Sequence, residues 1–185
     1  MNLRTLPLQA IFAASLALGV PALLAPAPAS AQEAPSGRLL DFCKSFLNSK
    51  KVDFKQLDGR TALKAPILES GRGWTFFVQT REAQEQIVMY STFPMAVPEA
   101  HRAAAMEFIT RANYGLILGN FEMDLSDGEV RYKTSIDVEK VNLTQELLNP
   151  LLYANIGTFR RYFDGLEAVA KGEKSPAAAI AEIEG

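Results

Sequence analysis

Residues 98–138, PEAHRAAAMEFITRANYGLILGNFEMDLSDGEVRYKTSIDV, decide the fold because their apolar period changes partway along the stretch. Up to Gly115 the period is helical, and Pro98 and Glu99 suit a helix start, since proline needs no N–H there and an acid favours the positive end of the helix dipole. Gly115 can take the left-handed conformation that ends many helices. The apolar side of this helix is expected to carry Met106, Ile109, Ala112, Asn113 and Leu116.

From Ile117 onward the period is two, as in strands with one buried face. Residues 121–125 and 130–136 alternate apolar and polar side chains. Between them, Asp127 and Gly128 have the chemistry of a two-residue hairpin turn, because Asp-Gly tolerates positive backbone angles. The stretch therefore predicts a helix followed by an antiparallel hairpin.

The chain before this stretch predicts a first helix and the rest of one sheet. Ser36 can cap a helix that runs to about Lys50. The strand candidates that follow are residues 52–57, 61–68, 74–79 and 87–93, and Pro66 marks the second of them as an edge strand or a bulge. The predicted fold class is α+β, with a single antiparallel sheet of about five strands in the order α-β-β-β-α-β-β-α and helices packed on the sheet.

The chain after the hairpin predicts a long helix that lies across the sheet. Asn149 as the cap with Pro150 at the first helical position is the preferred start, and a start at Thr144 with a kink at Pro150 remains open. Lys171 and Gly172 are expected to end this helix. Its apolar stripe comprises Leu148, Leu152, Asn155, Ile156, Phe159, Phe163, Leu166 and Ala170.

The chain begins with a predicted secretory signal peptide. Arg4 gives a positive start, residues 10–25 are apolar and uncharged, and the small residues around Ser30 form a cleavage signal that ends at Ala31. We therefore expect cleavage after Ala31 and a periplasmic or secreted protein. The expected divisions are residues 1–31 as signal peptide, 32–37 as a short leader, 38–172 as the α+β domain and 173–185 as a short C-terminal helical tail.

Charge and cysteine usage argue against several classes of function. The chain has a formal net charge of −2 and no basic stripe, which argues against a nucleic-acid partner. After the signal peptide no segment is apolar enough to span a bilayer, so stable membrane insertion is not expected after cleavage. Cys43 is the only cysteine and shares a helical face with apolar residues. It reads as a buried core residue, with an intermolecular disulfide as the alternative.

No residue pattern points to catalysis or to a bound metal. The single His101 lies far from Cys43, whereas metal sites of the His and Cys type need several ligands. The sequence has no Gly-x-Ser-x-Gly elbow and no Gly-rich phosphate loop. Asp124, Asp127 and Glu129 cluster at the hairpin but lack the calcium-loop pattern, so they read as turn residues. We expect a non-enzymatic protein with no catalytic residue, cofactor or metal.

Three asparagines are the most informative polar residues. Asn113 and Asn155 fall on apolar helix faces, where a buried amide must find hydrogen-bond partners. One interpretation is an internal network that fixes the helices to the sheet. The other is that these residues, together with Asn120, line a ligand groove between the sheet and the helices.

The order of elements and five short motifs resemble a known family. The motifs are residues 97–99 (VPE), 113–116 (NYGL), 119–122 (GNFE), 128–132 (GEVRY) and 153–155 (YAN). Over about residues 38–172 the chain resembles the YbjN-type domain, a family labelled "putative bacterial sensory transduction regulator". The family is similar in fold to type III secretion chaperones, which are dimers that bind extended segments of partner proteins. No catalytic residues are attributed to the family.

The resemblance and the residues together predict an exported, chaperone-like or regulatory module that binds protein. The alternative is a periplasmic small-ligand-binding regulator with a pocket between sheet and helices. Expected partners are a second copy of the chain, in a homodimer, and a protein or peptide segment. The resemblance and the apolar Phe77 and Val88 on the second sheet face suggest the homodimer. The expected binding residues are Asn113, Tyr114, Asn120, Asn155 and Trp74.

Overall fold

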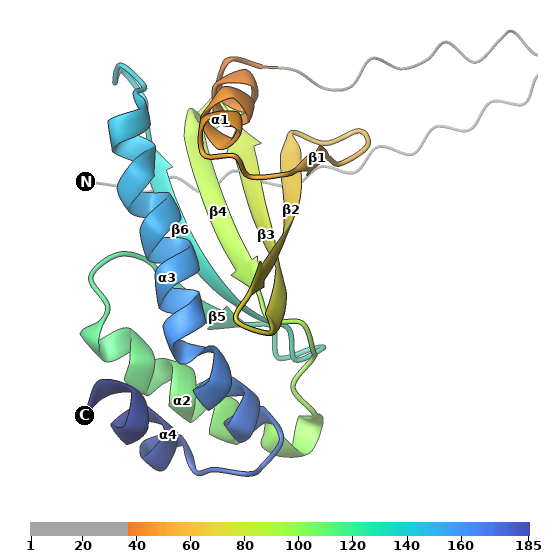
Figure 1. The fold of residues 1–185 in the computed structure, drawn as a ribbon, viewed down its shortest axis with the longest axis vertical. Coiled ribbons are helices and arrows are strands. Elements are labelled where there is room, and N and C mark those ends of the chain that lie inside the picture. Colours follow the sequence, from red (N-terminus) through yellow and green to blue (C-terminus); the bar gives the residue numbers. More distant parts are fainter. Residues whose placement is uncertain (1–36) are drawn as a thin grey trace, which may run out of the picture. The chain divides into compact units, whose positions relative to one another are not determined.

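The computed structural model describes residues 37–185, and the expected signal peptide, its cleavage site and the Ser36 cap lie outside that range. Helices, strands and two short 3-10 turns follow one another along this part of the chain. In order they are α1 (Arg38–Ser49), β1 (Lys55–Gln56), β2 (Ala62–Glu69), β3 (Arg72–Arg81), η1 (Glu82–Gln84), β4 (Gln86–Thr92), η2 (Glu99–His101), α2 (Arg102–Gly115), β5 (Asn120–Met123), β6 (Val130–Asp137), α3 (Gln145–Ala170) and α4 (Pro176–Glu184) (Figure 1).

The strands form one antiparallel sheet in the order β1-β2-β3-β4-β6-β5. The predicted α+β class and single antiparallel sheet are confirmed, and the sheet has six strands where about five were expected. Strand β1 lies within the candidate at residues 52–57 but has only two residues, both paired to β2. The last hairpin, β5–β6, joins the sheet with β6 beside β4. Strands β3 and β4 are therefore the central strands of the sheet.

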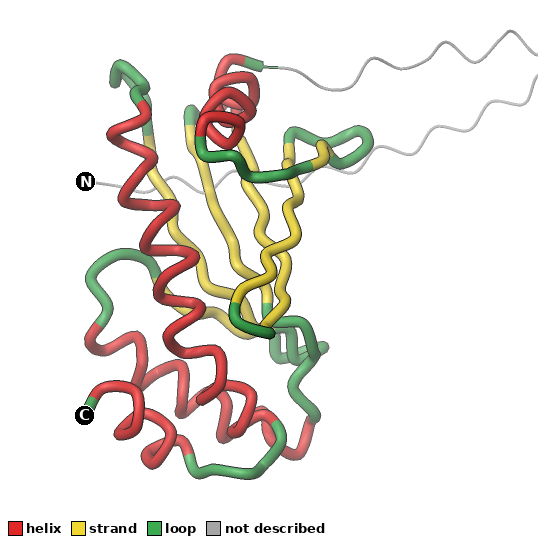
Figure 2. Tube along the Cα trace, viewed as in Figure 1, coloured by secondary structure: helices red, strands yellow, loops and turns green. Residues whose placement is uncertain are grey.

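Helices cover one face of this sheet. Helices α1 and α3 lie in front of the strands in Figure 1, and α2 and α4 lie below them; Figure 2 shows the same arrangement coloured by helix and strand. Two apolar clusters fill the space between the layers. One joins α1 and the start of α3 to the central strands, and the other joins α2, α4 and the rest of α3 to β5 and β6. Apolar residues at alternate strand positions therefore supply the core, as the period of two predicts.

Helix α2 begins later than predicted and ends where predicted, but without a left-handed residue at Gly115. The chain after Pro98 first makes the 3-10 turn η2, and the α-helix begins at Arg102. Gly115 ends the helix as expected, but the glycine with a left-handed backbone is Gly119, at φ +80°. A Cβ atom on Gly119 would lie 2.4 Å from the Lys133 carbonyl oxygen, so the approach of this loop to β6 requires a glycine. Met106, expected on the apolar side, is 38% exposed.

The β5–β6 connection is longer than the predicted two-residue turn. Strand β5 ends at Met123 and β6 begins at Val130. The Asp124 side chain accepts a hydrogen bond from the Ser126 N–H at 2.8 Å, and the Gly128 N–H donates to the Asp124 carbonyl at 2.8 Å. Such a side-chain turn is available to aspartate in a longer loop, and it competes with the tight Asp-Gly turn that the sequence suggested.

Helix α3 starts earlier than the preferred prediction and confirms the alternative start. Thr144 precedes the first helical residue, and Pro150 lies inside the helix. The physical reason is apolar burial: the turn before Pro150 carries the fully buried Leu148, which joins Leu151 and Leu152 in the cluster packed against the sheet. The gain from burying these leucines exceeds the cost of one missing backbone hydrogen bond near the helix start.

Candidate binding surface

Two of the five expected binding residues belong to a buried polar network. The Asn155 side chain is 0% exposed, and its Oδ1 accepts a hydrogen bond from Ser91 Oγ at 2.8 Å. Its Nδ2 lies 3.1 Å from the Met89 carbonyl oxygen and 3.2 Å from that of Tyr132. Trp74 Nε1 donates to Ser91 Oγ at 3.1 Å. This network ties helix α3 to strands β3, β4 and β6, as the internal-network interpretation of the asparagines predicts, and it leaves Asn155 and Trp74 unavailable to a ligand.

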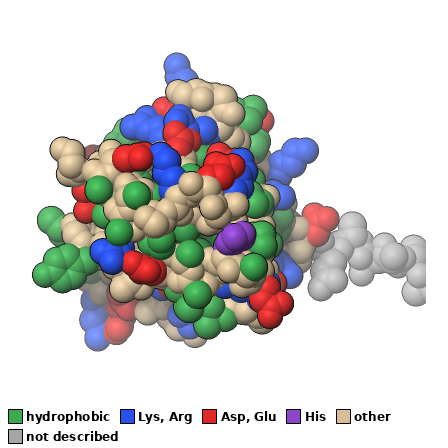
Figure 3. Space-filling model, turned by 90° about the horizontal axis from the view of Figure 1, so that it is seen from below, with side chains coloured by type: hydrophobic (Ala, Val, Ile, Leu, Met, Phe, Trp, Pro, Cys, Tyr) green, Lys and Arg blue, Asp and Glu red, His purple; other side chains and the backbone are tan. Residues whose placement is uncertain are grey.

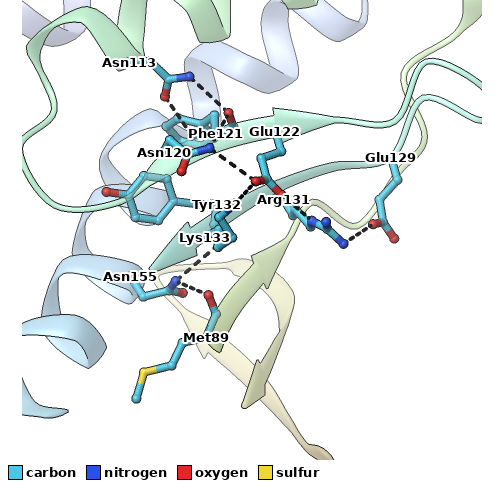
Figure 4. A network of polar contacts seen from close by, with 10 residues as sticks. All are labelled: Met89, Asn113, Asn120, Phe121, Glu122, Glu129, Arg131, Tyr132, Lys133 and Asn155. Carbon is cyan, nitrogen blue, oxygen red and sulfur yellow. Dashed lines mark hydrogen bonds and ion pairs between the residues drawn. The ribbon is translucent and has the colours of Figure 1, made fainter. Parts of the chain in front are cut away.

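Asn113 completes the edge of the sheet. The Phe121 N–H donates to Asn113 Oδ1 at 2.7 Å, and Asn113 Nδ2 donates to the Phe121 carbonyl at 3.1 Å. Figure 4 shows the amide facing the outer edge of β5. The side chain thus makes the pair of hydrogen bonds that a neighbouring strand would make, and it occupies part of an edge that could otherwise pair with another chain.

The other two expected residues lie on different surfaces. Tyr114 is 96% exposed at the end of α2, close in sequence to Ile117, which is 95% exposed. Asn120 lies on β5, where its Nδ2 is 3.3 Å from the Phe121 carbonyl oxygen and 3.5 Å from Glu122 Oε1. The five residues therefore do not form one site: two are buried, one completes the sheet edge and two are on separate surfaces.

The remaining candidate residues have structural roles. Cys43 is buried, and burial followed by the charge of Glu82 raises the pKa of its thiol to about 12. A thiol of this kind is neutral and packs as a small apolar residue, which confirms the core prediction. At the hairpin, Asp127 Oδ1 accepts from the Glu129 N–H at 2.8 Å. Among residues 37–185, no group of three or more His, Cys, Asp or Glu side chains is arranged to hold a metal ion.

The face of the sheet opposite the helices carries a row of aromatic and cationic side chains. Lys64, Phe77, Tyr90 and Lys133 are successive cross-strand partners on β2, β3, β4 and β6. Their side chains therefore lie in one row on the same face, with two aromatic rings between two lysines. Asn120 continues this row on β5. We call the outward-facing side chains of the six strands the open face, because no helix of the described part of the chain covers them.

Cations contact both rings of this row. Lys64 Nζ lies 5.9 Å from the centroid of the Phe77 ring, and the Arg131 guanidinium carbon lies 4.5 Å from that of the Tyr90 ring. These distances are within the range of cation–π attraction. Both rings are partly exposed, so the pairs hold aromatic surface and positive charge together at the centre of the open face.

An ion-pair cluster lies at the β5–β6 side of the open face (Figure 4). Glu122 pairs with Lys133 and, at 3.0 Å, with Arg131, whose guanidinium also lies 3.8 Å from Glu129. Partial burial acts to raise the pKa of Glu122, but the hydrogen bonds from Lys133 and Arg131 outweigh it and lower that pKa below its ordinary value of 4.5. Glu122 is therefore ionised at neutral pH and fixes both cations.

Several hollows lie on or beside the open face, including one of about 590 Å³ that Lys55 and Lys64 line together with Asp53 and Asp58. One of about 570 Å³ runs from Arg60 and Thr61 in the β1–β2 connection, over Phe77 and Tyr90, to Arg131. Another of about 320 Å³ is lined by residues that include Arg81, Val88, Lys133 and Asp137. The end of the molecule formed by α2 and α4 has a different surface from the open face. Hydrophobic side chains are interspersed there with charges of both signs (Figure 3).

Sequence reasoning found part of the open face. Strand alternation predicts a second, apolar face with Phe77 and Val88, but it does not connect Tyr90, Lys64 and Arg131 with them. The strand alternation carried enough information to place each residue on a face. It did not give the register, which decides that Lys64, Phe77, Tyr90 and Lys133 share one row.

Comparisons with known proteins place the chain in a family. A family model described as "Putative bacterial sensory transduction regulator", YbjN, matches residues 44–168. No match was found among curated proteins. The crystal structure of YbjN, a putative transcription regulator from E. coli, aligns with a TM-score of 0.52 at 15% identity, over 72% of this chain and 92% of that chain.

Two further structures give lower scores. The HopA1–SchA chaperone–effector complex aligns with a TM-score of 0.41 at 16% identity, over 68% of this chain and 96% of the other. The ExsC–ExsE complex aligns with a TM-score of 0.43 at 14% identity, over 68% and 93%. The family model spans more than half of the residues, including every strand and most of α3. The chain therefore belongs to the YbjN family.

Proposed function

We propose that this chain is a regulatory module that acts by binding another protein on its open face and catalyses no reaction. The family description, which names a regulator, supports the regulatory part. The observation that carries the binding part is the row of Phe77 and Tyr90 between Lys64 and Lys133, exposed on a face that no described helix covers. Aromatic residues and arginine are enriched in protein interfaces, and Arg131 lies against the Tyr90 ring.

The sheet edges favour binding across the face over strand addition. At one edge, the Asn113 amide occupies the outer hydrogen-bonding groups of Phe121. At the other edge, β1 has two residues and covers only part of β2. The uncovered part of β2 includes Pro66, which has no N–H to offer a new strand. Both edges are therefore protected in the ways that proteins use against edge pairing.

The proposal includes export and self-association. The signal-like residues 1–31 support action in the periplasm or outside the cell, and mass spectrometry of the purified native chain should find Gln32 at its N-terminus. Self-association through the open face would cover Phe77 and Tyr90. If light scattering detects only monomer across micromolar concentrations, the homodimer is excluded. The partner that binds the open face would then be a different protein.

A small ligand is the second candidate occupant. The hollow of about 570 Å³ over Phe77 and Tyr90 falls within the size range of ligand pockets. The pocket expected between sheet and helices near Asn155 is not its location, because that side chain is enclosed and bonded within the protein. A thermal-shift screen with anionic periplasmic metabolites tests this candidate, since a ligand that binds only the folded state raises Tm.

The test is a comparison of variants in pull-down experiments from the exporting compartment. The first variant combines Phe77→Ser with Tyr90→Ser on the open face. The matched control combines Tyr114→Ser with Ile117→Ser, which removes exposed apolar residues elsewhere. Circular dichroism first confirms that both variants are folded. We expect a stoichiometric partner of the wild-type chain to be lost with the first variant and kept with the control. A partner kept by the first variant, or lost with the control, contradicts the proposal.

A further inference from the structure

The open face has the opposite charge to the chain as a whole. The formal net charge of the chain is −2. The outward-facing strand positions carry the cations Lys55, Lys64, Arg81, Arg131 and Lys133 against the carboxylates Glu122 and Asp137. A face of positive sign on an acidic protein attracts an acidic partner.

Three cations of the open face form no ion pair in the described part of the chain, although Asp53 and Asp58 line the hollow beside Lys55 and Lys64, and Asp137 lines the one beside Arg81. Lys55 and Lys64 are direct cross-strand partners, so two like charges face each other on β1 and β2. Arg81 donates to the Gln86 side chain, which is uncharged. In the part of the chain that the structure describes, no carboxylate forms an ion pair with Lys55, Lys64 or Arg81. A carboxylate supplied from outside would relieve the repulsion between the two lysines.

The two sides of the face thus differ in their charge balance. On the β5–β6 side, Glu122 already holds Arg131 and Lys133 in fixed positions. On the other side, Lys64 contacts the Phe77 ring and Arg60 lines the hollow over that ring, whereas Arg81 lines the neighbouring hollow. A partner segment that crosses the face therefore meets unpaired positive charge at one end and the aromatic centre next to it.

We propose that the open face binds an acidic segment of a partner protein, whose carboxylates meet Lys55, Lys64, Arg60 and Arg81 and whose aromatic or aliphatic side chain enters the hollow over Phe77 and Tyr90. This inference rests on the proposed function and names the chemistry of the partner. Because both sheet edges are protected, the segment lies across the face as a helix or loop and does not extend the sheet. The aromatic centre supplies the affinity, and the cations supply attraction and orientation.

The experiment is a selection of random 16-residue peptides, displayed on phage, against the folded chain without its signal peptide. Enriched peptides are synthesised, and their affinities are measured by fluorescence anisotropy. The test variant combines Lys64→Glu with Arg81→Glu. The charge-matched control combines Lys44→Glu with Lys140→Glu, which lie on α1 and in the β6–α3 connection. A third variant, Tyr90→Ser, tests the apolar part.

The expected result is enrichment of acidic peptides that contain an aromatic or aliphatic residue. Their affinity should fall at least tenfold in the Lys64→Glu, Arg81→Glu variant and in Tyr90→Ser, and less than threefold in the control. Binding should also weaken between about 50 and 500 mM salt, because the ion pairs are solvent-accessible.

Three results with the peptides would overturn the inference. They are the absence of any enriched sequence, enrichment of peptides without an acidic bias, and equal affinity for the test and control variants. Tighter binding of a 20-nucleotide single-stranded DNA than of the best peptide would also overturn it, in favour of a nucleic-acid partner. Neutral or basic peptides that lose affinity in Tyr90→Ser would refute the acidic partner while leaving the proposed protein-binding function in place.

Discussion

Asn155 shows how one buried amide can connect three strands to a helix. Its side chain bonds to Ser91 Oγ and to the carbonyl oxygens of Met89 and Tyr132. In Asn155→Ala these buried groups lose a partner, and each buried unsatisfied polar group costs about 1–3 kcal/mol. We therefore expect a loss of at least about 2 kcal/mol in the free energy of unfolding, measured by urea denaturation. The exposed Asn142→Ala is the control, with an expected change below about 0.5 kcal/mol. Equal effects in the two variants would contradict the network.

Asn113 has a different role, because its amide occupies the outer edge of β5. In Asn113→Leu the N–H and carbonyl of Phe121 lose both partners, while the side chain keeps a similar size. We expect a loss of about 1–3 kcal/mol and concentration-dependent association through the freed edge. Urea denaturation and light scattering measure the two effects. Asn48→Leu, at an exposed position of α1, serves as the control. A variant as stable and as monodisperse as this control would refute the edge role.

Glu122 is expected to make the stability of the fold depend on pH. Its pKa in the folded chain lies below its ordinary value of 4.5, so the carboxylate stabilises the folded state above that value. This contribution is lost as the pH falls through the lower, folded-state pKa. The stability difference between wild type and Glu122→Gln should thus be present at pH 7 and shrink below about pH 4.5, with a size of about 1 kcal/mol or less because the ion pairs are partly exposed. A difference that stays constant from pH 7 to pH 3 would contradict the ion-pair cluster.

At the scale of elements, the sequence predicted which helices and strands exist better than how they begin and end. The period change between α2 and the β5–β6 hairpin is local information, and both elements are present. The start of α3 depends on two opposing contributions to the free energy of folding: the cost of Pro150 inside the helix and the gain from burying Leu148. A local rule placed Pro150 at the helix start, whereas the burial of Leu148 and its neighbours against distant strands extends the helix by a further turn. Local patterns do not contain that tertiary contribution.

Pro150 gives a direct test of this explanation. The residue is exposed and lies inside α3, where it supplies no backbone N–H. Pro150→Ala restores a helical hydrogen bond and removes a steric conflict, while the unfolded chain gains some freedom. We expect an increase of about 1–3 kcal/mol in the free energy of unfolding, seen as a higher Tm. A lower Tm would contradict this explanation, because it would mean that Pro150 stabilises the folded helix.

At the scale of the whole molecule, the sequence supported the fold class and family but not the assembly of a surface. Trp74 and Asn155 looked like binding residues because they are unusual in sequence, and unusual polar or aromatic residues also build cores. The open face combines residues from β2, β3, β4 and β6, which are up to 69 positions apart in the row from Lys64 to Lys133. Only the strand register brings them together, so a reading of local motifs missed most of the surface.

The central claim is that the open face is where this YbjN-family chain meets another protein. The most direct measurement is site-specific photo-crosslinking in cells, with p-benzoylphenylalanine in place of Tyr90. Tyr114 and Tyr153 are matched control positions, because both are exposed tyrosines on helices. The account predicts a discrete adduct with a second protein from position 90 and none from positions 114 and 153. Adducts from the control positions only, or none from position 90, would contradict it.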